Sequence, residues 1–341
     1  MKTKLLSSLL LSALIALPVA GAQADDSYPL RMGNITSNDA QEAMGQKFID
    51  LIRENSDGKI DGRLYSSASL GSNDEVMRGL QLGSIQANIN PTGYLTQFVP
   101  QAGVLALPWI FPGDDAGEMI ENITRVMRGE AAQEIKKLAA ERGFHIVSFF
   151  GIGPNQIFLN PDVTGIDDLD GKRIRTIAGK EHTQTVNDWG ARAIHMSLPE
   201  IYTSVQQGVL DGFDLPADVT LRVKYHEHAR NVLMTNHVGL VQYIAVSKRW
   251  YDGLPDDLKK VVDDAGREVE SIGTVAYVEA QTDALKTLAE DSRINLIELS
   301  EADRDSLREL NRQGIWAETE ADSVKGPVLK MLLNDVEKLA R

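Results

Sequence analysis

Residues 72–89 have the sequence SNDEVMRGLQLGSIQANI and decide the fold class. Ser72 and Glu75 form a capping box, so a helix is expected to begin there and to end at Gly83. The apolar run Ile85–Ile89 then predicts a strand. This unit follows a predicted strand, helix and short strand, which lie at Leu30–Thr36, 37–58 and Arg63–Tyr65. The resulting β-α-β-α-β order predicts a parallel sheet in an α/β domain.

A second α/β unit is predicted further along the chain. Gly151, Gly153 and Pro154 interrupt the pattern and suggest a crossing between two domains. Around this crossing we expect a helix at 116–143, strands at 145–150, 173–176, 209–213 and 237–247, and a helix at 181–189. The segment from Leu254 to about Asp291 predicts one helix long enough to brace two lobes. Two last helices are expected at 301–316 and 327–339.

The first 24 residues have the features of a secretory signal. Lys2 and Lys4 precede an apolar stretch, and Ala22-Gln23-Ala24 matches a cleavage site. The apolar stretch is too short for a stable membrane span. We therefore expect a periplasmic protein cleaved after Ala24. Removal of 24 of the 341 residues leaves 317, which favours two domains.

Composition excludes several functions. The mature chain has a net charge of −16, because the signal contributes two of the 35 basic residues and none of the 49 acidic ones. Such a surface argues against nucleic acid or anionic lipid as a partner. The chain has no cysteine, which rules out disulfides and thiolate chemistry.

Nucleotide and metal motifs are missing or incomplete. Gly151-Ile152-Gly153-Pro154 lacks the third glycine of a dinucleotide loop, and Gly171-Lys172 is followed by Arg173 instead of Ser or Thr. The six histidines are scattered, so we expect them at the surface and predict no metal site. We also expect no cofactor.

Lys172-Arg173-Ile174-Arg175 is the most unusual element. The two arginines alternate on a predicted strand, so both point to one face. A strand followed by a loop and helix ends where open α/β folds bind ligands. An arginine in a closed cleft binds a carboxylate through two parallel hydrogen bonds.

An ordered set of motifs along the mature chain resembles the periplasmic solute-binding proteins of tripartite ATP-independent (TRAP) transporters, of the C4-dicarboxylate type. The motifs are Leu70-Gly71, Gly79–Gly83, Ala106–Trp109, Asp170–Arg175, Gly190-Ala191, Met196–Tyr202 and Gln206–Gly212. The resemblance implies two α/β lobes joined by crossing strands, with the ligand between them. We assign 25–152 plus 241–280 to lobe I, and 153–240 plus 281–341 to lobe II.

The resemblance also implies the roles of individual residues and a partner. Arg175 matches the family's ligand-carboxylate arginine, and the loaded protein is expected to deliver its ligand, as a monomer, to an ion-gradient-driven membrane permease. The chain departs from the family at three positions: Asn155 replaces a second arginine, Leu215 an asparagine and Leu198 an aromatic. These changes favour a monocarboxylate, such as a sugar acid or a hydroxy- or keto-acid. The other residues expected to contact it are Asn34, Asn90, Thr92, Trp109, Asn155, Leu198 and Leu215, with Asp214 added if it faces the cleft.

Two other functions stay open at this stage. A sensor that reports to a membrane receptor would have the same fold and the same ligand site. An enzyme on this fold would need a base and a nucleophile within reach of each other, and the sequence shows no such pair. We therefore expect a binding protein and not an enzyme.

Overall fold

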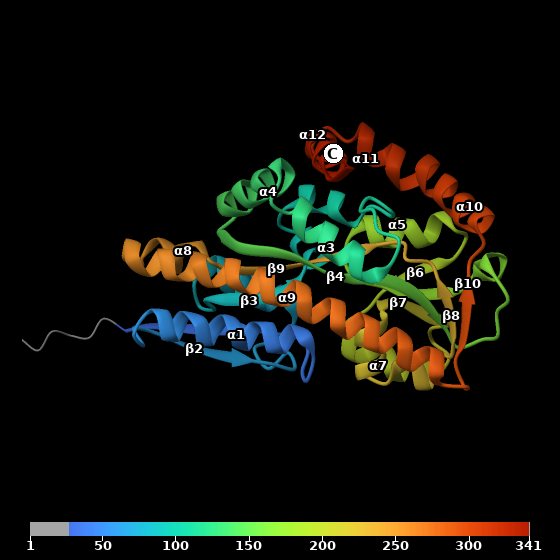
Figure 1. The fold of residues 1–341 in the computed structure, drawn as a ribbon, viewed down its shortest axis with the longest axis horizontal. Helices are drawn as coiled ribbons and strands as arrows, with labels where there is room; N and C mark the ends of the chain where they lie inside the picture. Colours follow the sequence, from blue (N-terminus) through green and yellow to red (C-terminus); the bar gives the residue numbers. More distant parts are fainter. Residues whose placement is uncertain (1–26, 341) are drawn as a thin grey trace, which may run out of the picture.

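The computed structural model describes residues 27–340, so the predicted signal and its cleavage site lie outside the described residues. Ten strands form one sheet that runs through both lobes, with β2-β1-β3-β9-β4-β7-β5-β6 as the main order (Figure 1). Their bounds are β1 Tyr28–Gly33, β2 Ile60–Tyr65, β3 Ala87–Pro91, β4 Phe144–Leu159, β5 Arg173–Thr176, β6 Arg192–His195, β7 Gly212–Pro216, β8 Asn231–Met234, β9 Gly239–Ser247 and β10 Asn295–Glu298.

Helices cover the sheet on both sides. They are α1 Ala40–Asn55, α2 Asn73–Leu82, α3 Ala116–Val126, α4 Glu130–Glu141, α5 Lys180–Asp188, α6 Ile201–Gln206, α7 Ala217–Arg222, α8 Lys248–Asp252, α9 Asp256–Glu290, α10 Glu301–Asn311, α11 Ala317–Ala321 and α12 Gly326–Glu337. Short 3₁₀ helices add η1 Thr92–Leu95, η2 Pro100–Ala106, η3 Ile166–Leu169, η4 Leu198–Glu200, η5 Tyr225–Glu227 and η7 Lys338–Ala340, and a π-helical turn covers Arg312–Trp316. No helix within residues 27–340 combines the length and apolarity needed to cross a membrane.

The predicted β-α-β-α-β unit is confirmed in lobe I. Strand β1 pairs in parallel with β2 on one side and β3 on the other. The capping box of α2 is present, since Ser72 Oγ accepts from the Glu75 N–H and Glu75 accepts from the Ser72 N–H. Gly83 ends the helix with a φ of 80° in the left-handed region, where glycine carries no Cβ penalty.

Strand β4 joins the two lobes. Its first half pairs with β9, and its second half pairs with β7 and β8. The sequence predicts a break at Gly151–Pro154, but the strand continues through it. A register shift between Gly151 and Gly153 absorbs the irregularity, and Gly153 takes a φ of 114°. The glycines therefore bend the crossing strand without ending it.

The bracing helix predicted from the sequence is confirmed as α9. Its 35 residues span roughly 52 Å at 1.5 Å per residue and lie along both lobes (Figure 1). Gly266 and Gly273 face the sheet, where a Cβ would come within 2.8 Å of Val147 and 3.0 Å of Phe150. Two glycines thus bring the helix close to β4.

The chain after residue 312 packs on the core of lobe I, which differs from the domain assignment expected from the sequence. Ile315, Val328, Leu329 and Leu332 belong to the same apolar core as residues of α3, α4 and the first half of β4. Figure 1 shows α12 beside α4. The C-terminal helices therefore complete the core of lobe I, whereas 281–341 was assigned to lobe II.

Candidate functional site

Arg175 is buried at the centre of lobe II. Strand β5 lies between β7 and β6 at the predicted bounds, and only 1% of Arg175 is exposed. Its Nε donates to the carbonyl oxygen of Met196 at 2.9 Å, which orients the guanidinium. Its Nη1 has no hydrogen-bond partner within the structure. A buried cation with an unused donor is unfavourable unless a ligand completes it.

Arg173, two residues earlier on the same strand, is used differently. Its guanidinium binds both carboxylate oxygens of Asp211, at 2.7 and 2.9 Å, and its side chain is 39% exposed. The sequence predicts only that both arginines point to one face of the strand; the structure buries Arg175 and leaves Arg173 partly exposed in an ion pair with Asp211.

Arg175 lines a partly open cavity of about 60 Å³ at the junction of the lobes. That volume is enough for a few water molecules but is smaller than the roughly 300–1,000 Å³ of typical ligand pockets, so the cavity has to widen to admit an organic ligand. Lobe I contributes Ile35, Thr36, Asp39, Ala40, Gln41, Pro91 and Tyr94; lobe II contributes Arg175, Ile177, Leu198, Leu215, Pro216, Asp218 and Val219; the crossing strands and α9 contribute Ile152, Leu240 and Tyr277.

Three of the predicted residues meet in this cavity, namely Arg175, Leu198 and Leu215. Asn34 lies behind its wall, where its Oδ1 accepts from Gln41 Nε2 at 2.6 Å. Asn90 and Thr92 are buried on either side of Pro91, a lining residue. The Asn90 Oδ1 has no partner in the structure, whereas its Nδ2 donates to Asn73 Oδ1 at 2.8 Å.

Asn155 and Asp214 do not line the cavity but meet each other within lobe II. Asn155 Nδ2 donates to Asp214 Oδ2 at 3.1 Å, and His237 Nε2 lies 3.8 Å from the same oxygen. Leu215 faces the cavity, so its neighbour Asp214 points to the other side of β7. This places Asp214 in a buried polar cluster in which Asn155 Oδ1, Asp214 Oδ1 and His237 Nε2 have no hydrogen-bond partner among the described residues.

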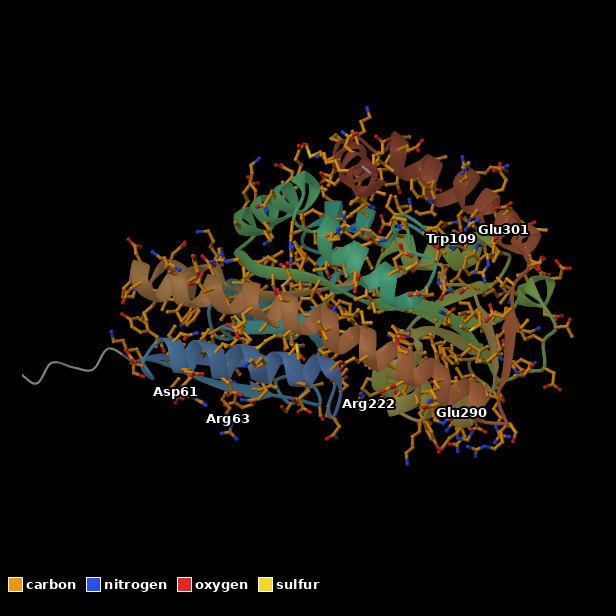
Figure 2. All side chains as sticks on the ribbon, viewed as in Figure 1. Asp61, Arg63, Trp109, Arg222, Glu290 and Glu301 are labelled. Atoms are coloured by element: carbon orange, nitrogen blue, oxygen red, sulfur yellow. The ribbon has the colours of Figure 1, made fainter. Side chains whose placement is uncertain are left out.

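Trp109 also lies outside the cavity. Its ring packs 6.0 Å from that of Trp189, with the Arg308 guanidinium 5.7 Å from its centroid. Figure 2 shows Trp109 near α10. Its backbone N–H donates to the His237 carbonyl at 2.7 Å, which holds the preceding loop against lobe II. The apolar contact predicted for Trp109 is therefore made with the protein core.

Asp39, Asp218 and Tyr277 line the cavity but were not predicted from the sequence. Asp39 caps α1 by accepting from the Glu42 N–H at 2.8 Å. Asp218 lies in the first turn of α7, where a negative charge is favourable at the positive end of the helix dipole. Because both carboxylates fit an ordinary helix-start pattern, no separate feature of the sequence marks them as site residues.

Two histidines contradict the predicted surface location, since His182 and His237 are each only 1% exposed. His237 Nδ1 lies 2.8 Å from Thr235 Oγ1. Burial lowers the pKa of His182 to about 4, despite the opposing influence of Asp214 and Glu181. His182 is therefore neutral in the folded protein at physiological pH.

Buried neutral His182 predicts a loss of stability in acid. Its folded pKa lies below the ordinary value of 6.5, so the unfolded chain takes up the proton more readily. This contribution to the free energy of unfolding is complete above pH 6.5 and is lost as the pH falls towards 4, by up to about 3 kcal/mol. Urea unfolding from pH 7 to 4 should show a shallower loss for His182→Gln. Asp218, whose pKa is raised to about 7, acts in the opposite sense in both proteins. Equal pH slopes would contradict a neutral buried His182.

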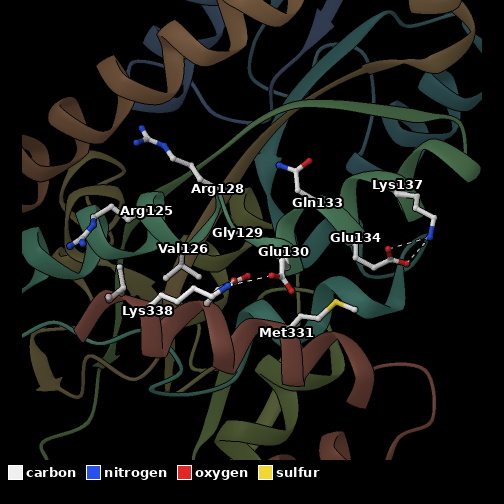
Figure 3. A pocket seen from close by; sticks show the side chains of 12 residues that line it. Arg125, Val126, Arg128, Gly129, Glu130, Gln133, Glu134, Lys137, Met331 and Lys338 are labelled. Atoms are coloured by element: carbon white, nitrogen blue, oxygen red, sulfur yellow. Dashed lines mark hydrogen bonds and ion pairs between the residues drawn. The ribbon is translucent and has the colours of Figure 1, made fainter. Parts of the chain in front are cut away.

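A larger hollow of about 730 Å³ lies on the surface between α3, α4 and α12 (Figure 3). Most of its charged side chains are already paired: Lys137 with Glu134, Arg128 with Glu270, and Lys338 with Glu130 and Asp335. It is open to solvent, where such pairs contribute little. The buried, incompletely bonded Arg175 therefore makes the smaller cavity the stronger candidate.

Comparison with known proteins shows the family. The model of bacterial extracellular solute-binding protein family 7 matches residues 33–322, so the chain belongs to this family. The predicted resemblance to TRAP solute-binding proteins is thereby confirmed. A solute-binding protein of Chromohalobacter salexigens is 24% identical over 283 residues, 82% of each chain. The C4-dicarboxylate-binding periplasmic protein DctP of Rhodobacter capsulatus is 24% identical over 314 residues, 90% of this chain and 91% of that protein.

Solved structures confirm the two-lobed α/β fold. The sugar acid binding protein DctPAm of Advenella mimigardefordensis, in complex with galactonate, matches with a TM-score of 0.84 at 22% identity, covering 92% of this chain and 99% of that one. A TRAP periplasmic solute-binding protein of Desulfovibrio salexigens, with bound orotic acid, matches with a TM-score of 0.85 at 23% identity, covering 92% and 100%.

Proposed function

We propose that this chain captures a small organic monocarboxylate between its lobes and delivers it to a TRAP permease. The observation that carries the proposal is Arg175, buried to 99%, with an unpaired Nη1 beside a partly open cavity between the lobes. A carboxylate offers two acceptor oxygens in the geometry of a guanidinium fork. The galactonate and orotic acid bound by the two similar proteins above both carry an acid group, which supports this class of ligand.

Closure of the lobes would allow a single arginine to bind a carboxylate tightly. In an open form Arg175 faces water, where an ion pair gains little. When lobe I covers the site, the local dielectric falls and the same pair strengthens. Since ligand binds the closed form better than the open one, it shifts the population towards closed. Arg175 is the one positively charged residue among those that line the cavity, so a second acid group on the ligand would have no cationic partner there, and this favours a monocarboxylate.

Membership of the family supports the proposed delivery and location. The proposed role is binding and transfer in the periplasm, without chemical change to the ligand. Lys2, Lys4 and the Ala22-Gln23-Ala24 sequence support export and cleavage after Ala24. A permease that accepts the loaded protein has to distinguish the closed shape from the open one. We propose a monomer, because lobe closure and docking both need free surfaces.

A thermal-shift screen against a library of small carboxylates tests the proposal. A ligand that binds only the folded state at about 100 times its Kd adds about 2.7 kcal/mol, which corresponds to a rise in Tm of about 5 °C or more. We expect at least one monocarboxylate to give such a rise, and its uncharged amide to give none. A library in which no acid changes the Tm would contradict the proposal.

A further inference from the structure

Two carboxylates lie in the same cavity as Arg175. Asp39 comes from the N-terminus of α1 in lobe I, and Asp218 comes from the first turn of α7 in lobe II. Asp218 is only 4% exposed, and its Oδ1 accepts a hydrogen bond from Gln281 of α9. The cavity therefore contains acidic groups from both lobes in addition to the buried arginine.

These carboxylates have no cation of their own inside the cavity. Arg175 is the one positively charged residue among those that line it. Arg222 acts on both carboxylates from outside: it is exposed, and its guanidinium donates to the carbonyl of Asn38 where α7 approaches α1 (Figure 2). Burial raises the pKa of Asp39 and of Asp218, the latter to about 7. The acidic groups are thus incompletely compensated.

Tyr277 lies in the same cavity as the two carboxylates. It projects from α9 into the same cavity, and burial together with Asp39 and Asp218 raises its pKa. Asp39 and Asp218 are the acidic residues among those that line this cavity. The two carboxylates need a positively charged partner. Arg175 needs a negatively charged one, because its unpaired Nη1 is buried at the same cavity.

The remaining walls are mainly aliphatic. Ile35, Ile152, Ile177, Leu198, Leu215, Val219 and Leu240 also line the cavity. Its uncharged polar side chains are Thr36, Gln41, Tyr94 and Tyr277, so a polyhydroxylated acid would leave several of its hydroxyls against aliphatic groups without partners. A simple anion would satisfy Arg175 but bring a further negative charge close to two carboxylates.

We propose that the ligand is a compact zwitterion: an acid group for Arg175, an apolar body for the aliphatic walls, and a cationic nitrogen for Asp39 and Asp218. This inference rests on the proposed function, because it assigns the carboxylate to Arg175, and it narrows the ligand from monocarboxylates in general to those that also carry a positive charge.

Isosteric pairs separate charge from shape. Glycine betaine and 3,3-dimethylbutanoate differ only in a cationic nitrogen in place of a carbon, and L-proline and cyclopentanecarboxylate form a second pair. Thermal shift and calorimetry on the mature protein would use these pairs within a panel of small zwitterions and their anionic isosteres. We expect the zwitterion of a binding pair to bind at least about tenfold more tightly, because a cation near a partly buried carboxylate is strongly attracted.

Three variants test whether Asp39 and Asp218 cause the preference for a zwitterion over its anionic isostere. Asp218→Asn and Asp39→Asn should each reduce zwitterion affinity about tenfold or more while leaving the anionic isostere's affinity equal or higher. Asparagine is as good a helix cap as aspartate, so Asp39→Asn keeps α1 intact. Glu42→Gln is the control, since it removes a negative charge from the same helical turn without lining the cavity.

The results of these experiments separate zwitterion binding from the more general carboxylate binding on which it rests. If anions raise the Tm in an Arg175-dependent way and zwitterions do not, the zwitterion is wrong and the carboxylate function stands. If neither class raises the Tm, both are wrong. Zwitterion binding that Asp39→Asn and Asp218→Asn leave unchanged would overturn the assignment of the cation to these residues.

Discussion

Replacing Arg175 with alanine is expected to weaken carboxylate binding by roughly two to four orders of magnitude. Removing one partner of a buried charged pair costs about 3–5 kcal/mol, because the other charge is left without compensation. Arg175→Lys should also lose most binding, since an ammonium is a point charge that cannot form two parallel bonds to a carboxylate. Isothermal titration calorimetry with the acid selected by the thermal screen measures both effects.

Arg173→Ala is the matched control for this result. It removes the same side chain from the same strand, but its guanidinium is occupied by Asp211 at the surface. The affinity of Arg173→Ala should therefore stay within about threefold of the unaltered protein, as surface ion pairs contribute about 0–1 kcal/mol. An Arg175→Ala protein that binds as tightly as the Arg173→Ala protein would remove the basis of the proposed function.

Phe158→Ala is expected to lower the free energy of unfolding by about 3–5 kcal/mol. Phe158 has no exposed surface, and its ring stacks on that of Phe213 at 5.3 Å across the paired strands β4 and β7. Truncation would open a cavity in the lobe II core, directly behind the strand that carries Leu215. Such a loss is a large fraction of the 5–15 kcal/mol typical of a folded domain.

Urea unfolding followed by circular dichroism measures this change. Leu82→Ala serves as the control, because Leu82 is 71% exposed at the end of α2 and its loss should stay within about 0.5 kcal/mol. A Phe158→Ala protein as stable as the Leu82→Ala protein would show that the stacked pair does not hold the two strands together.

Local patterns were sufficient where the stabilising contact lies within a few residues. The predicted capping box at Ser72 is present, and β5 has the predicted bounds. The long helix was also predictable, because it contains no proline after Pro255 and has an apolar seam along its length. In each case the sequence near the element contains the information that determines it.

Contacts between distant residues could not be predicted in this way. The helix expected at 116–143 is two helices, because Gly129 begins α4 and the N–H of Ala131 is capped by Asp335, which lies 204 residues away. A Cβ on Gly129 would come within 2.3 Å of that carboxylate group, so the approach requires glycine. The packing of α12 on lobe I depends on the same contact.

The residues of the candidate site also differ in whether local sequence or distant contacts determine their position. The strand that carries Arg175 was predictable, and its family motif singled it out, whereas its contact with a ligand stays a prediction. Asp39 and Asp218 were not predictable as lining residues, since each carboxylate has an ordinary role at the start of a helix. Only the packing of distant segments brings them into one cavity with Arg175.

The most direct test of the central claim is a crystal structure of the mature protein with the acid that the thermal screen selects. The account predicts one carboxylate oxygen of the ligand within about 3 Å of Arg175 Nη1, between the closed lobes. A ligand found elsewhere, such as the surface hollow between α4 and α12, with Arg175 making no contact to it, would contradict the account.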